Sequence, residues 1–381
     1  MADSIVRYLR GRQDPATGLL ESFSSSADPE LHEVSFTYDL ALATLVFVHS
    51  SAFTEAARLA EFFRAMPFPD PVTGAYNTAY RTQGGAPALE EAFQVGPVAW
   101  VAIALLRYGK ARRESRCLAR AVALMDWVRR HVPHEEGGVV MGTKAPWSER
   151  MSSENNWAYY AALRLAIQAV SDRKLRQALI EEKLGVRRWL AKAGSRRGRQ
   201  DAVKALDVYS NALLVGPEAH LEDVVAGDQA TLAAWAKGWI EELEQYFRVP
   251  NSSAYDFTDE AEAQRISRMR VGWLEGTEQV TVAYQTWAPF FEQVGDPLFA
   301  QHLLERASLA DEHVLRHRLT ADGGTAIPNT DSADPVRTFS DGWVARPCTE
   351  PALNGTTWAY FAMTGFNPFA APLTMRRRAS A

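Results

Sequence analysis

Cysteine is scarce in this chain, which holds two among its 381 residues. Cys117 and Cys348 lie far apart in the sequence, and neither stands beside a histidine or shows the spacing of metal ligands. The scarcity excludes a disulfide-stapled scaffold and predicts two free thiols in a reducing compartment. We expect no metal ion and a metal-independent activity.

Long apolar runs are also missing. No stretch of about 18 consecutive apolar residues occurs, so no membrane-spanning helix is expected. The first residues, Met1 to Arg7, carry no apolar core of a signal peptide. The sequence therefore predicts a cytoplasmic protein with no membrane partner, while the processed form of a secreted protein stays open.

Charge of one sign is not in large excess. Lys and Arg number 41 and Asp and Glu number 46, and the net charge of −5 gives no support to a nucleic-acid partner. The basic segment 173–199 also contains acidic residues and leucines at helical spacing, so we interpret it as the solvated face of an outer helix and its loop. A glycine-rich phosphate loop is lacking, so no nucleotide and no other cofactor is expected.

Helical periodicity is what the sequence has in abundance. Six segments are apolar nearly all round and rich in alanine, which is typical of buried helices: 38–48, 96–108, 156–170, 206–215, 277–294 and 356–364. Six others have one apolar stripe and one charged face: 2–12, 54–66, 114–131, 172–192, 228–247 and 296–317. The two kinds alternate along the chain. Short strands are expected within loops, at 139–141 and 325–327.

This alternation predicts an all-α fold, an (α/α)6 toroid of six inner and six outer helices with long rim loops. No Gly/Ser/Pro linker divides the chain, so we expect one domain over 1–370 and a basic C-terminal tail over 371–381. The long loops precede the inner helices and should gather at one end of the ring. The N-termini of the inner helices open there, with unpaired N–H groups and positive dipole ends.

A turn motif recurs along the chain. Asp14-Pro15-Ala16-Thr17-Gly18 returns at 70–74, and looser versions stand at 136–138 and 322–324. After each turn an acidic residue lies at or near the start of an apolar helix: Asp39, Glu91, Glu154 and Glu350. This repetition predicts that a ring of helices presents carboxylates to a shared central pocket.

Acid/base chemistry has five candidates: Glu154, Glu275, Asp39, Asp207 and Glu278. Glu154 should lie in the first turn of a helix capped by Ser152 or Ser153. Glu275 and Glu278 are three residues apart, so they would share one helix face, where two acids can split their pKa values. Asp39 and Asp207 open apolar helices, where a carboxylate is costly unless it is paired or faces a cavity. The alternative for each acid is simple helix capping.

The toroid, the acidic helix starts and the aromatic loops together resemble the (α/α)6 superfamily of glycoside hydrolases and related carbohydrate-active enzymes, without pointing to one family in it. The resemblance is carried by SFTYDLA at 35–41, SSENNWAY at 152–159, LDVYS at 206–210, GWLEGTEQ at 272–279 and LNGTTW at 353–358. It implies hydrolysis of a glycosidic bond by one protonated acid and a second carboxylate. We expect Glu154 and Glu275 to be this pair, in an inverting arrangement, with Asp39 and Asp207 as second choices.

Other side chains are expected to bind the substrate through amide groups, carboxylates and aromatic stacking. They are Tyr38, Glu91, Trp147, Asn155, Asn156, Trp157, Tyr209, Trp273, Trp343, Glu350, Asn354 and Trp358. For the loop aromatics, the alternative is packing within the loops themselves. The substrate is a small molecule or an oligosaccharide, and the sequence does not fix the oligomeric state.

Other chemistries on related toroids find less support. Zinc-dependent prenyltransferases and thioether cyclases need a Cys/His/Asp ligand set, and terpene cyclases carry an Asp-rich motif that is absent here. Sugar 2-epimerases place histidines on inner helices, whereas the eight histidines of this chain lie mostly on outer helices or in loops. Two alternatives stay open. One is a cyclase or lyase of small-molecule biosynthesis that stabilises a cation on aromatic faces, and the other is a non-catalytic helical binding protein.

Overall fold

The computed structural model describes residues 1–66, 76–89, 93–199, 201, 203–223 and 228–370. Helices dominate these ranges, as the periodicity predicted, and the strands are short and lie in loops. The predicted turn at 70–74, Glu91 and the tail 371–381 lie outside the described residues.

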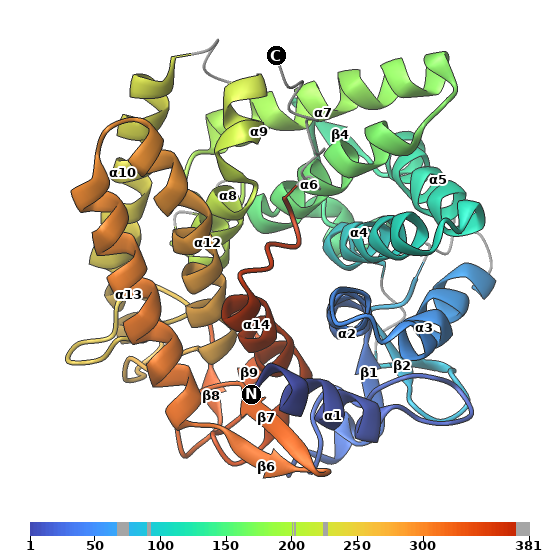
Figure 1. The fold of residues 1–381 in the computed structure, drawn as a ribbon, viewed down its shortest axis with the longest axis horizontal. Coiled ribbons are helices and arrows are strands. Elements are labelled where there is room, and N and C mark those ends of the chain that lie inside the picture. The colour runs from blue at the N-terminus through green and yellow to red at the C-terminus, as the bar shows by residue number, and fades with distance from the viewer. Residues whose placement is uncertain (67–75, 90–92, 200, 202, 224–227, 371–381) are drawn as a thin grey trace, which may run out of the picture.

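Six helices of the described chain form a closed inner ring (Figure 1). They are α2 (Thr37–His49), α4 (Val95–Arg112), α6 (Ser153–Ala169), α8 (Leu206–Leu214), α12 (Leu274–Gln293) and α14 (Leu353–Thr364). Each packs against the next along the chain, and α14 packs against α2 to close the ring. The toroid prediction is confirmed.

An outer layer surrounds the inner ring in the described structure. It consists of α1 (Ala2–Arg12), α3 (Phe53–Ala65), α5 (Ser115–His131), α7 (Arg173–Ala193), α10 (Gln229–Phe247) and α13 (Pro297–Arg316). Each outer helix buries its apolar stripe against the inner helix beside it. The short helices α9 (Gly216–Asp223) and α11 (Glu260–Arg265) were not predicted.

Small antiparallel sheets stiffen the loops that precede the inner helices. One has the order β1 (Val34–Phe36), β2 (Ala79–Arg81), β3 (Pro87–Ala88), and another the order β10 (Pro351–Ala352), β7 (Gly324–Pro328), β6 (Leu319–Ala321). Two hairpins pair β4 (His134–Glu135) with β5 (Gly138–Val139) and β8 (Val336–Arg337) with β9 (Val344–Ala345). Strands β5 and β7 overlap the loop strands expected from the sequence, and Asp322 and Gly323 make the predicted turn with positive φ.

The same backbone hydrogen bond recurs at the start of every inner helix. The N–H of the first helical residue donates to a carbonyl in the loop before the next inner helix, at 2.8–3.0 Å. The pairs are Thr37 to Thr78, Val95 to Met141, Ser153 to Arg197, Leu206 to Phe257, Leu274 to Asn329 and Leu353 to Ser22. The last pair returns to the first loop, so the bonds run around the whole ring. They satisfy one unpaired donor of each helix and hold the six helix starts in equivalent settings.

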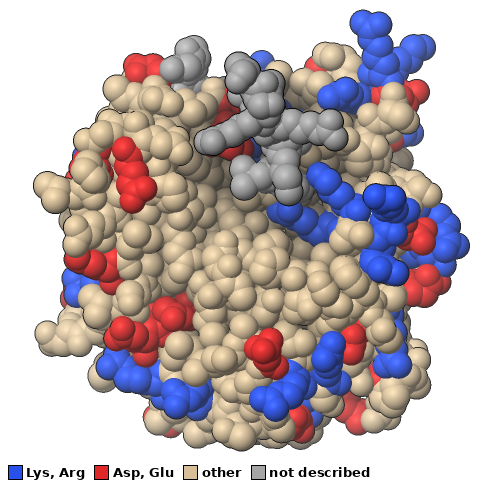
Figure 2. Space-filling view, in the orientation of Figure 1, with Lys and Arg blue, Asp and Glu red and all other residues tan. Residues whose placement is uncertain are grey.

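The opposite end of the ring is covered by the chain after α14, which crosses its middle in Figure 1. Asn367 donates to the carbonyl of Leu214 at the end of α8, and Arg107 of α4 donates to the carbonyl of Pro368. Phe369 is fully buried with its ring 4.7 Å from that of Trp100. In Figure 2 the middle of this face carries few charged side chains, which gather around its margin. Among the described helices, none is long and apolar enough to cross a membrane.

Candidate active site

The N-terminal ends of the inner helices bring the predicted acids together. Glu154, Asp207 and Glu275 are each the second residue of their helix, and Asp39 is the third residue of α2. The other second positions hold Tyr38, Gly96 and Asn354. These positions are equivalent because one recurring backbone hydrogen bond fixes every first residue in the same way.

None of these four carboxyl groups occupies the N-cap position of its helix. The N-caps are Phe36, Ser152, Ala205 and Trp273, of which Ser152 accepts a hydrogen bond from the N–H of Asn155. The acids therefore lie inside the first turn, where the helix dipole favours negative charge. None of the four acids is itself the capping residue, although Glu154 follows the Ser152 cap in the first turn of α6, as its capping alternative held.

Glu154 and Glu275 hold their protons unusually tightly. Burial raises the pKa of Glu154 to about 8, and the charges of Asp207 and Glu275 raise it further. Burial likewise raises the pKa of Glu275 to about 8, against hydrogen bonds from Tyr38 and Gln279 that lower it. In the described structure the Glu154 carboxyl has no hydrogen-bond or ion-pair partner, and it stays partly accessible to solvent. Both groups are largely protonated at neutral pH.

Asp39 and Asp207 titrate at lower pH. Burial raises the pKa of Asp39 to about 7, with a hydrogen bond from Ser22 acting against it. Burial also raises the pKa of Asp207. The positive charge of Arg197 offsets part of this effect, so the pKa rises only to about 6. Asp207 is therefore the group of the four that ionises first as the pH rises. One of its oxygens, Oδ1, is buried without a hydrogen-bond partner among the described residues.

A hydrogen-bonded chain orients Glu275. The hydroxyl of Tyr38 donates to its Oε1 at 2.7 Å, and the indole N–H of Trp358 donates to that hydroxyl at 2.8 Å. Gln279, one turn along α12, donates to the same oxygen at 3.3 Å and accepts from Ser210. The geometry thus fixes one carboxyl oxygen of Glu275 in place.

Aromatic rings lie beneath this acidic end. Trp100 makes an edge contact with Tyr38, with ring centroids 5.4 Å apart, and another with Trp358 at 6.0 Å. On its other side Trp100 meets Phe369 from the segment that covers the far end of the ring. Trp358 was expected to stack on the substrate, but it is fully buried and supports Tyr38 instead.

Three loop tryptophans have different surroundings. Trp273 is buried and stacks on Phe257 with ring centroids 4.7 Å apart, so it packs within its loop, as the alternative for loop aromatics held. Trp343 meets Phe257 edge-on and remains 48% exposed. Trp147 is half-buried below the guanidinium of Arg150, which lies 5.7 Å from its ring centroid. Trp343 is the most exposed of these three rings.

Glu278 does not lie on the same side of α12 as Glu275, which corrects the expectation of two acids on one face. It is fully buried and faces Asp311 of the outer helix α13. Burial raises the pKa of Glu278, and the carboxyl of Asp311 raises it further. Neither of its oxygens has a geometrically defined hydrogen bond among the described residues. The three-residue offset rotates Glu278 toward the outer layer.

Two predicted stacking aromatics also point outward. Trp157 lies against His220 of α9, with ring centroids 5.9 Å apart, and under Arg187 of α7. The hydroxyl of Tyr209 donates to Glu242 of α10 at 2.6 Å. Both rings fill the space between the inner and outer layers, so neither is placed to stack on a ligand at the acidic end.

The remaining predicted polar residues differ in their contacts. Most are hydrogen-bonded within the protein, whereas Nδ2 of Asn155 is buried without a hydrogen-bond partner among the described residues. Asn156 holds the loop at Val139, accepting from its N–H and donating to its carbonyl, both at 2.9 Å. Asn155 fills the space beside Gly96, where a Cβ would stand 2.3 Å from its Oδ1. Asn354 accepts from the N–H of Gly355.

Glu350 has a pKa below its usual range. Burial alone would raise this pKa, but hydrogen bonds from Arg346 and the N–H of Ala27 outweigh the effect of burial. Glu350 thus takes part in an internal ion pair with Arg346.

A second cluster of reactive side chains escaped the sequence reasoning. His313, His317 and Asp331 come together on the outer side of the ring. The signal in the sequence was two histidines four residues apart on one helix, a spacing that places both on the same face.

No protein-family model matches the chain, and no curated protein matches it. Solved structures do resemble it over nearly its whole length. A cellobiose 2-epimerase from Spirochaeta thermophila DSM 6192 has a TM-score of 0.68 at 15% identity, covering 96% of this chain and 94% of that one. A D-mannose isomerase has a TM-score of 0.67 at 11% identity, covering 95% and 96%. A glycosidase variant in complex with glucose has a TM-score of 0.64 at 11% identity, covering 96% of each chain. The chain has the (α/α)6-toroid fold of these proteins.

Proposed function

We propose that this chain is a carbohydrate-active enzyme that hydrolyses a glycosidic bond by carboxyl acid/base catalysis at the N-terminal end of the ring. The observation that carries the proposal is the group of four acids, Asp39, Glu154, Asp207 and Glu275, with pKa values of about 7, 8, 6 and 8. Glycoside hydrolysis needs one carboxylic acid and one carboxylate at the same time. Groups whose pKa values are pushed apart on either side of neutrality supply both.

Glu154 and Asp207 fit these two roles best. At pH 7 Glu154, with a pKa of about 8, keeps its proton and can donate it to the leaving oxygen. Asp207, with a pKa of about 6, is mostly ionised and can activate water or stabilise positive charge on the sugar ring. This moves the preferred partner of Glu154 from Glu275 to Asp207. Glu275, held by Tyr38 and Gln279, would bind sugar hydroxyls or share the proton of the pair.

Epimerisation or isomerisation of a sugar is the second candidate. It is favoured by the neighbours named cellobiose 2-epimerase and D-mannose isomerase. Against it stands the position of the histidines, since a sugar 2-epimerase is expected to carry them on inner helices. Here His49 lies at the far end of α2 from Asp39, and His220 belongs to α9. The cyclase alternative rests on the aromatic rings below the acids, whereas a ring centre filled by side chains would favour the non-catalytic binding protein.

Turnover of four variants tests the proposal on a panel of aryl glycosides, disaccharides and free sugars. Glu154→Gln and Asp207→Asn should each lower turnover by about 10²–10⁴-fold, since each removes one partner of proton transfer. Glu275→Gln should weaken substrate binding and turnover. Glu278→Gln is the matched control, because it makes the same change one turn further on in a side chain that faces the outer helix. Full activity of Glu154→Gln and Asp207→Asn on a cleaved glycoside would contradict the assignment.

The pH profile separates the two roles. Turnover should rise as Asp207 ionises near pH 6 and fall as Glu154 loses its proton near pH 8. The negative charge of Asp207 raises the pKa of Glu154, so Asp207→Asn should move the alkaline limb to lower pH. An alkaline limb that stays in place in this variant would argue against the coupling. Epimerisation without cleavage, detected by exchange of solvent deuterium into a free sugar, would favour the second candidate.

A further inference from the structure

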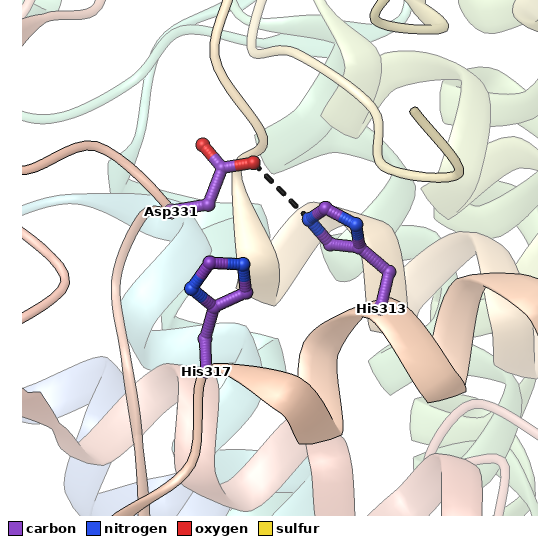
Figure 3. A group of neighbouring side chains, drawn as sticks. All are labelled: His313, His317 and Asp331. Atoms are coloured by element: carbon purple, nitrogen blue, oxygen red, sulfur yellow. Dashed lines mark hydrogen bonds and ion pairs between the residues drawn. The ribbon is translucent and has the colours of Figure 1, made fainter. Parts of the chain in front are cut away.

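A compact group of nitrogen and oxygen ligands lies at the periphery of the ring, beside the loop that leads into α12. His313 and His317 project from the last turn and C-terminal end of α13, and Asp331 follows β7 (Figure 3). In Figure 3 both imidazole rings and the carboxylate point toward a common space. His313 and Asp331 also line a surface recess with Arg248, Ser252 and Arg316.

The separations suit one bound ion. Nε2 of His313 lies 3.1 Å from Oδ2 of Asp331, and one ligand atom from each of the three residues lies within 4.8 Å of the others. A metal bound at about 2.0–2.2 Å from nitrogen and oxygen ligands needs ligand atoms about this far apart. The two rings of His313 and His317 have centroids 5.1 Å apart, so small rotations about their side-chain bonds bring the third ligand into range.

Groups behind the ligands already hold them in orientation. The second oxygen of Asp331, Oδ1, accepts the N–H of Gly272 at 2.8 Å, which leaves Oδ2 toward the histidines. Nδ1 of His313 lies 3.4 Å from the hydroxyl of Ser252, which leaves Nε2 toward Asp331. Fixed partners of this kind are the usual support of metal-binding histidines and carboxylates.

The ligand chemistry selects the class of ion. Two imidazoles and one carboxylate suit Zn²⁺ and the neighbouring transition metals, whereas Ca²⁺ and Mg²⁺ prefer several oxygen ligands. Arg248 and Arg316 line the same recess and work against a cation held by charge alone. Ligand bonds to nitrogen are therefore what such a site would depend on.

We infer that His313, His317 and Asp331 form a binding site for Zn²⁺ or a similar transition-metal ion. The ion would tie the outer helix α13 to the loop that follows β7, which is hydrogen-bonded to the loop before α12. The backbone of Asp331 donates to the carbonyl of Gly272 at 3.0 Å, and Leu274 donates to that of Asn329. Metal binding at Asp331 would thus brace the turn that leads into Glu275. The inference of a metal site does not rest on the function proposed above.

Metal binding by the full chain tests the inference. After removal of metal with EDTA, titration with ZnCl2 followed by calorimetry should show one equivalent bound, with a rise in the melting temperature. His313→Ala and His317→Ala should each weaken Zn²⁺ binding by more than about 10–100-fold. That range is the usual effect of losing a group that only supports a ligand, and each of these variants loses a ligand itself. Asp331→Asn keeps an oxygen for the N–H of Gly272 and should weaken binding without unfolding the loop. His302→Ala, on the exposed face of the same helix, is the control and should bind as the parent does.

Each outcome bears on the inference directly. Loss of the bound equivalent in both single histidine variants, with circular dichroism unchanged, supports the site. If a histidine variant does not fold, two other measurements decide the matter. One is Zn²⁺ binding by Asp331→Asn, and the other is competition by Co²⁺, whose visible absorption reports binding to nitrogen ligands. Binding of Zn²⁺ that survives in His313→Ala and His317→Ala, or melting raised by inorganic phosphate and not by ZnCl2, would overturn it. In the phosphate case the recess would belong to Arg248 and Arg316.

Discussion

At the scale of single residues, Glu278 shows how burial beside a second carboxyl group affects the free energy of unfolding. It is fully buried, and burial followed by the neighbouring carboxyl of Asp311 raises its pKa well above the usual range. A carboxyl with a higher pKa in the folded than in the unfolded chain binds its proton more tightly when folded. Its contribution to stability is therefore fully present below the unfolded value of about 4.5 and is lost as the pH rises toward the folded value.

Replacing Glu278 by glutamine should remove this loss. The amide keeps a donor toward Asp311 but cannot ionise, so Glu278→Gln should raise the free energy of unfolding by about 1–3 kcal/mol at pH 8. The gain should shrink at pH 5, where the parent carboxyl is protonated. Thermal unfolding of both proteins at the two pH values measures this, with the exposed Glu241→Gln as control. Equal gains at both pH values would mean that ionisation of Glu278 is not the cause.

Gly96 is a second residue whose role is decided by space. A Cβ at this position would stand 2.3 Å from Oδ1 and 2.9 Å from Cγ of Asn155, so Gly96→Ala must displace that side chain. We expect a loss of about 1–3 kcal/mol of stability from this overpacking. Gly238, exposed in the middle of α10, has no atom within 4 Å of the place where a Cβ would stand, so Gly238→Ala should stabilise by up to about 1 kcal/mol. Urea unfolding of the two variants compares them, and a neutral Gly96→Ala would show that Asn155 yields freely.

At the scale of elements, the helices were predictable and their orientation was not. The twelve predicted helical segments match the described helices because the amphipathic and fully apolar patterns differ strongly along the chain. A helix that is apolar on all sides has no polar face to mark its inner side. Nothing in SSENNWAY therefore shows that Trp157 turns outward to His220 while Glu154 remains at the ring end.

The position within the helix carried more information than the residue type did. Glu154, Asp207 and Glu275 were predicted as site residues from their places at helix starts, and the structure brings these helix starts to one end of the ring. Glu278, Tyr209 and Trp157 lie further along their helices, where rotation by about 100° per residue carries side chains away from that end. Trp100 was missed for the same reason, since one tryptophan inside an apolar helix gives no sign that its ring contacts Tyr38 and Trp358.

The loop contacts could not be predicted from the sequence, because they depend on the paths that the loops take. Glu350 meets Arg346 and the N–H of Ala27, and Asp256 meets Arg268 and Arg270, pairs set by the loop paths. Asp331 reaches His313 across the same kind of gap. The turn motifs predicted where the chain reverses but not which loop lies beside it.

At the scale of the whole molecule, the described inner helices form a closed ring. The first and last inner helices, α2 and α14, pack together, and the outer helix α1 covers α14 and β7. One cluster of buried apolar side chains runs through all six inner and all six outer helices of the described chain. The hydrogen bond from Leu353 to Ser22 closes the series of helix starts. The sequence predicts a single domain over 1–370. The cooperativity of unfolding tests this prediction.

We expect the chain to unfold as one unit, so that damage at α1 is felt on the opposite side of the ring. Leu9 of α1 is fully buried, and Leu9→Ala should cost about 2–5 kcal/mol. If the ring is one unit, calorimetry should show a single transition at lower temperature, and hydrogen exchange in α6 should speed up as much as in α14. Leu304→Ala, at a position 45% exposed on α13, should leave both unchanged. Early loss of protection in α1, α14 and β7 while α4 to α7 stay protected would divide the ring into two units. In that case α6 and α8 would keep Glu154 and Asp207 in place without α14. Closure of the ring by α14 would then not be needed to hold the helix starts that carry these two acids.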